Sequence, residues 1–275
     1  MESEPGEPLV EAVDVNAHPV AWREAGAGDT IVFLHGLGGT RTAWEPQLAG
    51  LGDTWRCVAW DMPGYGASAN DKPLTFPAIA AAVVGLLDAL GVDRVHLCGL
   101  SFGGQQALHT VLEYPERVAS LVLADTSAAF GMDGTDPATW KRARLRPLEQ
   151  GSTPADIAER AITAVAAPGF GGVHRAEAVA AFSRITSAGL RAACECLPSH
   201  DVRSRLAEIV APTLVVVGEL DQETPPLYSE MLAAGIGSST LEVIPGVGHL
   251  TPSEAPTAFN RLVRAFLQDR TTVRT

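Results

Sequence analysis

The sequence predicts an α/β fold: a mostly parallel, eight-stranded sheet covered by helices on both faces, with a helical cap inserted between two strands. Short β-branched apolar runs alternate with segments whose apolar residues recur at helical spacing. The runs are apolar on both faces, as strands of a buried parallel sheet are. This alternation breaks after residue 125 and resumes near residue 206. We therefore expect a core of residues 1–125 and 206–275 and a cap of residues 126–205.

The first part of the chain alternates strands with helices. The loosely alternating segment over residues 11–26 predicts an antiparallel hairpin at the edge of the sheet. One predicted helix has Thr75 as its candidate N-cap and Gly91 at its end, and another is expected over residues 102–113. Apolar strands are predicted over residues 30–36, 55–61, 94–99 and 118–124.

The second part begins with a long helical segment. Residues 130–205 show helical spacing and no convincing strand. Helices are expected there over residues 140–148, 154–166, 173–185 and 190–197. The alternation then resumes with strands over 212–221 and 240–245 and helices over 227–234 and 256–267. An all-helical insert between parallel strands predicts a cap that lies over the sheet.

Composition and charge exclude several classes of function. With 46% apolar and 19% charged residues, the chain can bury a sizeable core, which argues against extensive disorder. The net charge of −12, without a cluster of basic residues, disfavours nucleic acid as a partner. The N-terminus lacks the basic and apolar regions of a signal peptide, and the longest apolar stretch, over residues 76–87, is too short to span a bilayer. A cytoplasmic protein without a membrane partner is expected.

The cysteines and glycines predict no metal or cofactor. Cys57 and Cys98 lie within apolar runs and are expected as buried thiols. Cys194 and Cys196 have no second ligand pair nearby, so no metal site is predicted. The glycine-rich segment that begins at His35 lacks the spacing of a phosphate-binding loop. We therefore expect chemistry performed by the protein's own groups, without a metal or an organic cofactor.

The strongest local motif is Gly-Leu-Ser-Phe-Gly at residues 99–103, between a predicted strand and a predicted helix. This matches the pattern G-x-S-x-G, in which a serine projects from a tight turn and the glycines let strand and helix approach closely. The helix behind the serine also directs its positive N-terminus at the site of attack. Ser101 is therefore the predicted nucleophile.

A serine nucleophile needs a base at the same edge of the sheet, and the base needs an acid. His249 follows the last predicted strand in a glycine-rich loop and is the expected base. Among the other histidines, His200 belongs to the cap, where it could line a pocket but a surface position is expected. Asp221 ends the preceding strand and is the expected acid, with Asp125, which ends the strand before the cap, as the alternative.

Two backbone N–H groups should stabilise the oxyanion of a tetrahedral intermediate. Phe102, the residue after the nucleophile, is expected to supply one of them. Residues 35–39, His-Gly-Leu-Gly-Gly, follow the first central strand, and Leu37 is expected to supply the other. His35 itself is expected to brace this loop.

These residues, with residues 61–68 (Asp-Met-Pro-Gly-Tyr-Gly-Ala-Ser), make the chain resemble the α/β-hydrolase superfamily from about residue 31 to 266. Residues 126–130 and 212–214 make it most similar to small bacterial esterases and 3-oxoadipate enol-lactonase-like hydrolases. Serine at position 101 disfavours epoxide hydrolases and haloalkane dehalogenases, which use aspartate. Leu100 stands where carbon–carbon-bond hydrolases often have asparagine.

The resemblance implies a serine hydrolase that cleaves a small carboxylic ester or lactone through an acyl-enzyme. Two alternatives stay open: a carbon–carbon-bond hydrolase of meta-cleavage products, and a non-catalytic receptor with the same fold. The complete Ser/Asp/His set argues against the receptor. The expected partner is a small-molecule substrate, and a homo-oligomer is compatible with the sequence.

Apolar residues near the catalytic turns, or at the start of the cap, are candidates for the substrate pocket, with core packing as the alternative. They are Trp44, Phe130, Met132, Trp140 and Leu250. Arg142 and Arg144, on the first cap helix, could hold a substrate carboxylate, as an enol-lactone would require, or point to water.

Overall fold

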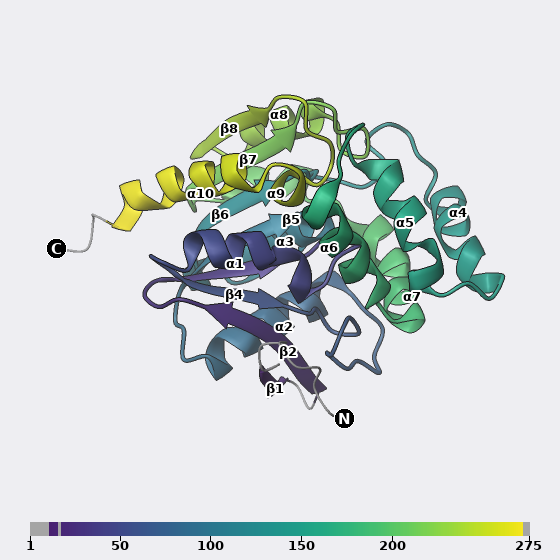
Figure 1. The fold of residues 1–275 in the computed structure, drawn as a ribbon. Coiled ribbons are helices and arrows are strands. Elements are labelled where there is room, and N and C mark those ends of the chain that lie inside the picture. The colour runs from purple at the N-terminus through teal and green to yellow at the C-terminus, as the bar shows by residue number, and fades with distance from the viewer. Residues whose placement is uncertain (1–10, 16–17, 272–275) are drawn as a thin grey trace.

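The computed structural model describes residues 11–15 and 18–271. Over these residues, eight strands form one sheet in the order β1-β2-β4-β3-β5-β6-β7-β8 (Figure 1). β2 is antiparallel to both β1 and β4, whereas every other neighbouring pair is parallel, as predicted. The strands are β1 (Glu11–Val15), β2 (His18–Ala25), β3 (Thr30–Leu34), β4 (Arg56–Trp60), β5 (Val95–Leu100), β6 (Val118–Ala124), β7 (Thr213–Gly218) and β8 (Ser239–Ile244).

Helices cover both faces of this sheet. α1 (Glu45–Leu51) and α10 (Pro256–Thr271) lie in front of it in Figure 1. The opposite face is covered by α2 (Phe76–Ala89), α3 (Phe102–Glu113) and α8 (Pro226–Gly235). Shorter helical turns are η1 (Arg41–Trp44), η2 (Pro115–Arg117), η3 (Leu197–Ser199), η4 (Arg203–Glu208) and α9 (Thr251–Glu254).

Successive side chains of each strand enter different apolar cores. In β3, Ile31 and Phe33 pack into the core formed with α1 and α10, whereas Val32 and Leu34 pack into the core on the other face. All four side chains are fully buried. This two-sided burial explains why the central strands are apolar without alternation.

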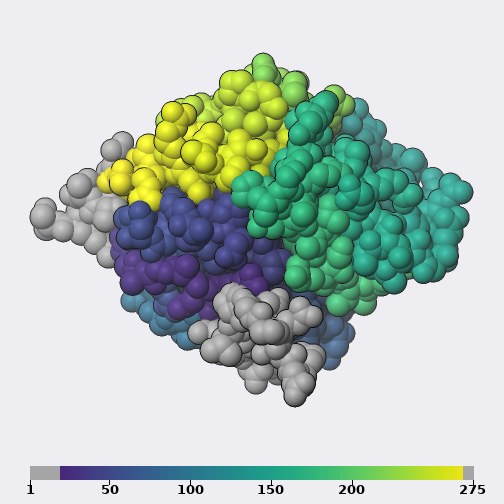
Figure 2. Space-filling view, viewed as in Figure 1, coloured from purple at the N-terminus to yellow at the C-terminus, as the bar shows by residue number. Residues whose placement is uncertain are grey.

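A helical segment lies between β6 and β7 and packs beside the edge of the sheet where β5 ends. It appears in teal and green in Figure 2, against the yellow C-terminal helix. Its helices are α4 (Pro137–Glu149), α5 (Pro154–Val165), α6 (Gly172–Ser183) and α7 (Ser187–Cys196). We call this segment the cap. An isolated bridge between Ala129 and Asp201 ties its two ends together.

Capping residues explain where three cap helices begin. α4 and α7 each start three residues before the predicted position, because the side chains of Asp136 and Thr186 accept hydrogen bonds from the first turn. α5 begins at the predicted residue, after a capping box between Thr153 and Asp156. Within the described ranges, no helix combines the length and apolarity that a membrane crossing requires.

Candidate active site

Ser101 occupies the tight turn between β5 and α3. Its φ of 55° and ψ of −117° lie in a region that residues other than glycine rarely adopt. Neighbouring glycines make the turn possible, since a Cβ on Gly99 would collide with the backbone of Gly103. A Cβ on Gly103 would collide with the carbonyl group of Leu34. The turn therefore presents the Ser101 hydroxyl at the carboxyl end of β5, in front of the N-terminus of α3.

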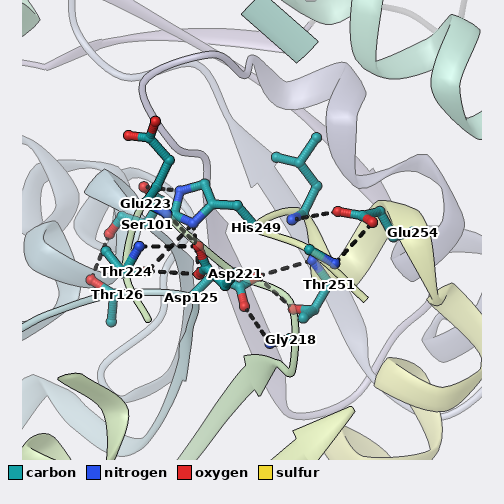
Figure 3. Close-up of polar contacts among 12 residues, drawn as sticks. Ser101, Asp125, Thr126, Gly218, Asp221, Glu223, Thr224, His249, Thr251 and Glu254 are labelled. Carbon is teal, nitrogen blue, oxygen red and sulfur yellow. Dashed lines mark hydrogen bonds and ion pairs between the residues drawn. The ribbon is translucent and has the colours of Figure 1, made fainter. Parts of the chain in front are cut away.

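The structure brings Ser101, His249 and Asp221 into one hydrogen-bonded chain (Figure 3). Nε2 of His249 lies 2.9 Å from Oγ of Ser101, and Nδ1 lies 2.8 Å from Oδ2 of Asp221. Asp221 follows β7 and His249 follows β8, so both leave the same edge of the parallel sheet. Because an ionised carboxylate only accepts, Nδ1–H donates to Asp221 and Nε2 is left to accept the Ser101 hydroxyl proton.

Asp221 is held by donors from its own loop. Its Oδ1 accepts from the backbone N–H of Glu223 and of Thr224, at 2.9 and 3.0 Å, and its Oδ2 accepts from the Thr224 hydroxyl at 2.8 Å. Burial raises the pKa of Asp221, but His249 and these Thr224 hydrogen bonds outweigh burial and lower it below its usual value. Asp221 is therefore an ionised, fixed acceptor for His249.

The environment of His249 favours its protonated form. Burial alone lowers the pKa of the imidazole, but the charge and hydrogen bond of Asp221 act in the opposite direction. Weaker contributions come from the charges of Asp125 and Glu223, and the pKa rises to about 9. An imidazolium formed during proton transfer is thus stabilised at this position.

Asp125, the alternative acid, does not bind His249. Its carboxylate accepts hydrogen bonds from the N–H of Gly218 at 3.0 Å and from the N–H and hydroxyl of Thr251 at 2.9 and 2.8 Å. Burial and the charge of Asp221 raise the pKa of Asp125 to about 7, although His249 and Thr251 oppose the shift. Asp125 therefore holds the backbone at Gly218, the end of β7, and at Thr251, after the histidine loop, whereas Asp221 binds the His249 imidazole.

The loop that carries His249 is tied to the cap through Glu254. One carboxylate oxygen accepts from the N–H of Gly248 and of Ala167, at 3.0 and 2.9 Å, and the other accepts from Leu250 N–H at 3.0 Å. The N–H of His249 itself donates to the carbonyl of Val165, at the end of α5, over 3.1 Å. Sequence reasoning missed Glu254, although an acidic residue in the first turn after the histidine loop was a usable signal.

The glycine loop after β3 lies against Ser101, with Gly36 close to the Ser101 Cβ. His35 braces this loop as expected: its Nδ1–H donates to the Gly36 carbonyl at 2.9 Å, and its Nε2 accepts from Met62 N–H at 3.1 Å. Burial lowers the pKa of His35, so the ring stays neutral. The Tyr65 hydroxyl donates to the Leu37 carbonyl at 3.1 Å and fixes the orientation of that peptide.

A cavity of about 620 Å³ lies between the cap and the sheet, with Ser101 and His249 in its wall. Four of the predicted pocket residues line it: Phe130, Met132, Trp140 and Leu250. Leu37 also lines the cavity, whereas the Phe102 side chain is buried beside Phe76, which leaves only its backbone near Ser101. Side chains of α5, α6, α7 and η3 complete the wall, and sequence reasoning did not identify them: Ile157, Phe182, Leu190, Cys194 and Leu197.

Trp44 is a wrong prediction for the pocket. Its side chain is 1% exposed and packs against the Phe33 ring, with ring centroids 5.0 Å apart, in the core beneath α1. The two cap arginines also differ, because Arg144 lines the cavity, whereas Arg142 donates to the Thr139 hydroxyl and does not. The cysteines of the chain are free buried thiols.

Comparisons with known proteins agree with this fold. The profile of the alpha/beta hydrolase family matches residues 31–262. The chain is 31% identical over 244 residues to 3-oxoadipate enol-lactonase 2 of Acinetobacter baylyi, covering 86% of this chain and 88% of that protein. It is 29% identical over 285 residues to a 2-hydroxy-6-oxo-6-phenylhexa-2,4-dienoate hydrolase of Comamonas testosteroni, covering 94% of each.

The fold is also similar to solved structures. A thermophilic esterase from Thermogutta terrifontis superposes with a TM-score of 0.86 at 28% identity, covering 95% of this chain and 99% of that one. The family profile spans most of the chain and includes the serine turn and the histidine loop. The chain therefore belongs to the alpha/beta hydrolase family.

Proposed function

We propose that this hydrolase cleaves a small carboxylic ester or lactone with Ser101, His249 and Asp221 as its catalytic triad. The observation that carries the proposal is the continuous hydrogen-bonded chain from Ser101 through His249 to Asp221 in the wall of a cavity. This arrangement supplies a nucleophile, a base and the acid that orients the base.

The reaction proceeds in two stages. In the first, Oγ of Ser101 attacks the substrate carbonyl carbon while Nε2 of His249 takes the hydroxyl proton. The tetrahedral intermediate then collapses, the leaving alkoxide takes that proton from His249, and an acyl-enzyme remains. In the second stage, His249 takes a proton from water, the hydroxide attacks the acyl carbon, and the proton returns to Ser101 as the carboxylic acid leaves.

The backbone N–H groups of Leu37 and Phe102 are the proposed donors to the oxyanion in both stages. Gly36 packs beside Ser101, and the Leu37 carbonyl is engaged by Tyr65, which orients the loop. Phe102 is the first residue of α3, so its N–H needs no partner within the helix. These contacts support a preformed site rather than one that assembles on binding.

Carbon–carbon-bond hydrolysis is the second candidate, because one relative is named for a phenylhexadienoate substrate. A second relative of that name, from Burkholderia cepacia, is 31% identical, as is the enol-lactonase, so identity does not separate the two classes. Leu100, which stands where carbon–carbon-bond hydrolases often have asparagine, favours the ester or lactone class. The two reactions share Ser101 and differ in the first step, since a vinylogous diketone must be protonated on carbon before the serine attacks.

The test compares kcat/KM for p-nitrophenyl butyrate, a small lactone and a vinylogous 1,5-diketone on the wild-type protein. The proposal expects the ester or the lactone to be preferred over the diketone. A hundredfold preference for the diketone, equivalent to about 2.7 kcal/mol of transition-state discrimination, would establish the carbon–carbon reaction instead. Loss of ester turnover in the Ser101→Ala variant links the activity to this site.

A further inference from the structure

An ion pair joins the cap to the core across the wall of the cavity. Nη2 of Arg144, on α4, donates to both carboxylate oxygens of Glu223, at 3.0 and 2.8 Å. Both residues line the cavity, and their side chains are 35% and 36% exposed. The pair is therefore partly shielded from bulk water and faces any bound substrate.

Both partners are fixed by other contacts. Glu223 follows the proposed catalytic acid by two residues, and its N–H donates to Asp221 Oδ1 at 2.9 Å. Figure 3 shows its side chain extending away from the hydrogen bonds around Asp221. The Arg144 guanidinium lies 5.4 Å from the centroid of the Trp140 ring, which meets Phe130 edge to face at 5.3 Å. Phe130, Trp140, Arg144 and Glu223 thus form one continuous wall, which we call the aromatic wall.

The charges at the aromatic wall disfavour a second carboxylate. Arg144 is the partly buried cation of the aromatic wall, and its guanidinium is already paired with the carboxylate of Glu223. Two other charged side chains that line the cavity, Arg160 and Asp133, are exposed and are screened by water, and His249 is already paired with Asp221. A substrate carboxylate at the aromatic wall would have to displace Glu223 or lie beside it. The repulsion between two carboxylates that are only partly exposed to water would oppose its binding. The chain's net charge of −12 adds a longer-range repulsion.

We propose that Glu223 is a specificity-determining residue that makes this site select esters or lactones whose remote end is uncharged and apolar, and reject those that carry a free carboxylate. This inference rests on the proposed ester or lactone hydrolysis. Arg144 then holds Glu223 and the aromatic wall in place and is not a receptor for an anionic substrate.

The test uses two esters that differ only at the remote end: p-nitrophenyl hexanoate, which ends in a methyl group, and mono-p-nitrophenyl adipate, which ends in a carboxylate. Wild-type protein should have a kcat/KM at least tenfold higher for hexanoate. In Glu223→Gln, Arg144 loses its anionic partner, so the hexanoate-to-adipate ratio should fall at least tenfold. The ratio is measured within one protein at one pH, so any effect of Glu223 on the basicity of His249 cancels.

Two further variants act as controls. Glu195→Gln removes the partner of Lys141. This pair joins α7 to α4, the helix that carries Arg144, with an N–O distance of 3.0 Å, and it lies outside the cavity, so the ratio should stay unchanged. Arg144→Gln leaves Glu223 without its cation, so the ratio should rise above that of wild type.

The outcomes separate this inference from the proposed function. If wild-type protein hydrolyses neither ester nor any lactone, the proposed function fails. If it hydrolyses esters but prefers the adipate, or if Glu223→Gln leaves the ratio unchanged, the inference is overturned while the proposed function stands. A preference for adipate that disappears in Arg160→Gln would assign the anion site to α5 instead.

Discussion

Oδ2 of Asp221 lies 2.8 Å from Nδ1 of His249, and this contact distinguishes two aspartates that follow neighbouring strands. Asp125 follows β6, yet its carboxylate accepts from Gly218 and from Thr251, which lies two residues beyond His249. Asp221 thus orients the imidazole ring, while Asp125 anchors the loop that carries it.

Because Asp221 contacts the His249 ring and Asp125 contacts the loop that carries it, substitutions of the two aspartates should lower kcat to different extents. Asp221→Asn should lower kcat about 10⁴-fold, because the amide cannot hold the same tautomer of His249. Asp125→Asn should lower kcat less than about 100-fold, because the His249 ring keeps its hydrogen bond to Asp221. Ester turnover by both purified variants measures the difference, and equal losses would show that the two carboxylates act on the ring together.

The raised pKa of His249 predicts an alkaline pH profile. Catalysis needs neutral imidazole, and a pKa of about 9 means that the neutral fraction grows about tenfold per pH unit below that value. For a neutral ester, kcat/KM should therefore rise from pH 6 to near pH 9 and then level off. A plateau that is already reached below pH 7 would contradict the coupling of His249 to Asp221.

The same shift affects stability. Folding raises the pKa of His249 above its unfolded value of about 6.5. The contribution of the protonated ring to the free energy of unfolding is therefore complete below pH 6.5 and is lost as the pH rises towards 9. His249→Gln removes this titration, so its free energy of unfolding should fall less than that of wild type between pH 6.5 and 9. Urea titrations at the two pH values provide the comparison.

Glu254 predicts a link between the cap and the position of His249. Glu254→Ala leaves three backbone N–H groups without their acceptor, which should reduce the free energy of unfolding by about 1–3 kcal/mol. It should also lower kcat more than it raises KM, because the variant displaces the proposed base and not the substrate. Glu254→Gln keeps one oxygen that can accept from Gly248 and Ala167, and should restore most of the loss. Failure of the glutamine variant to recover kcat would show that the charge, and not the geometry, is required.

A buried histidine pair predicts loss of stability in acid. Nε2 of His109 lies 3.1 Å from Nδ1 of His200, whose Nε2–H donates to the Ser127 carbonyl at 2.9 Å, so His109 donates and both rings are neutral. Burial lowers the pKa of both to about 4. The contribution of the two neutral rings to the free energy of unfolding is therefore complete above about pH 6.5 and is lost as the pH falls towards 4.

His109→Gln keeps a donor to His200 and removes one of the two titrating groups. Between pH 7.5 and 5, its free energy of unfolding should therefore fall less than that of wild type. Parallel curves for the two proteins would rule out the pair as a source of acid sensitivity.

Most of the fold and the three central residues could be predicted from the sequence. Ser101, Asp221 and His249 each follow an apolar strand, and the carboxyl ends of parallel strands meet at one edge of the sheet. The choice between Asp221 and Asp125 depended on which side chain reaches the ring, because both follow strands in the same way.

The pocket was less predictable because proximity along the chain does not say which face a side chain occupies. Trp44 follows the glycine loop but turns under α1 against Phe33. His200, expected at the surface of the cap, is 1% exposed because the bridge between the ends of the cap brings it against His109. Helical periodicity predicts an apolar face, but not whether that face meets the sheet or a cavity.

Covalent labelling with a fluorophosphonate tests the central claim most directly, since the reagent reacts preferentially with an activated serine and forms a stable adduct there. Mass spectrometry of the wild-type protein should find one adduct, on the peptide that contains Ser101, formed in step with the loss of ester hydrolysis. Ser101→Ala should form no adduct and should lose at least about 10⁴-fold in kcat. Labelling of another residue in step with inactivation, or more than a tenth of wild-type activity in folded Ser101→Ala protein, would contradict the assignment of Ser101 as the nucleophile.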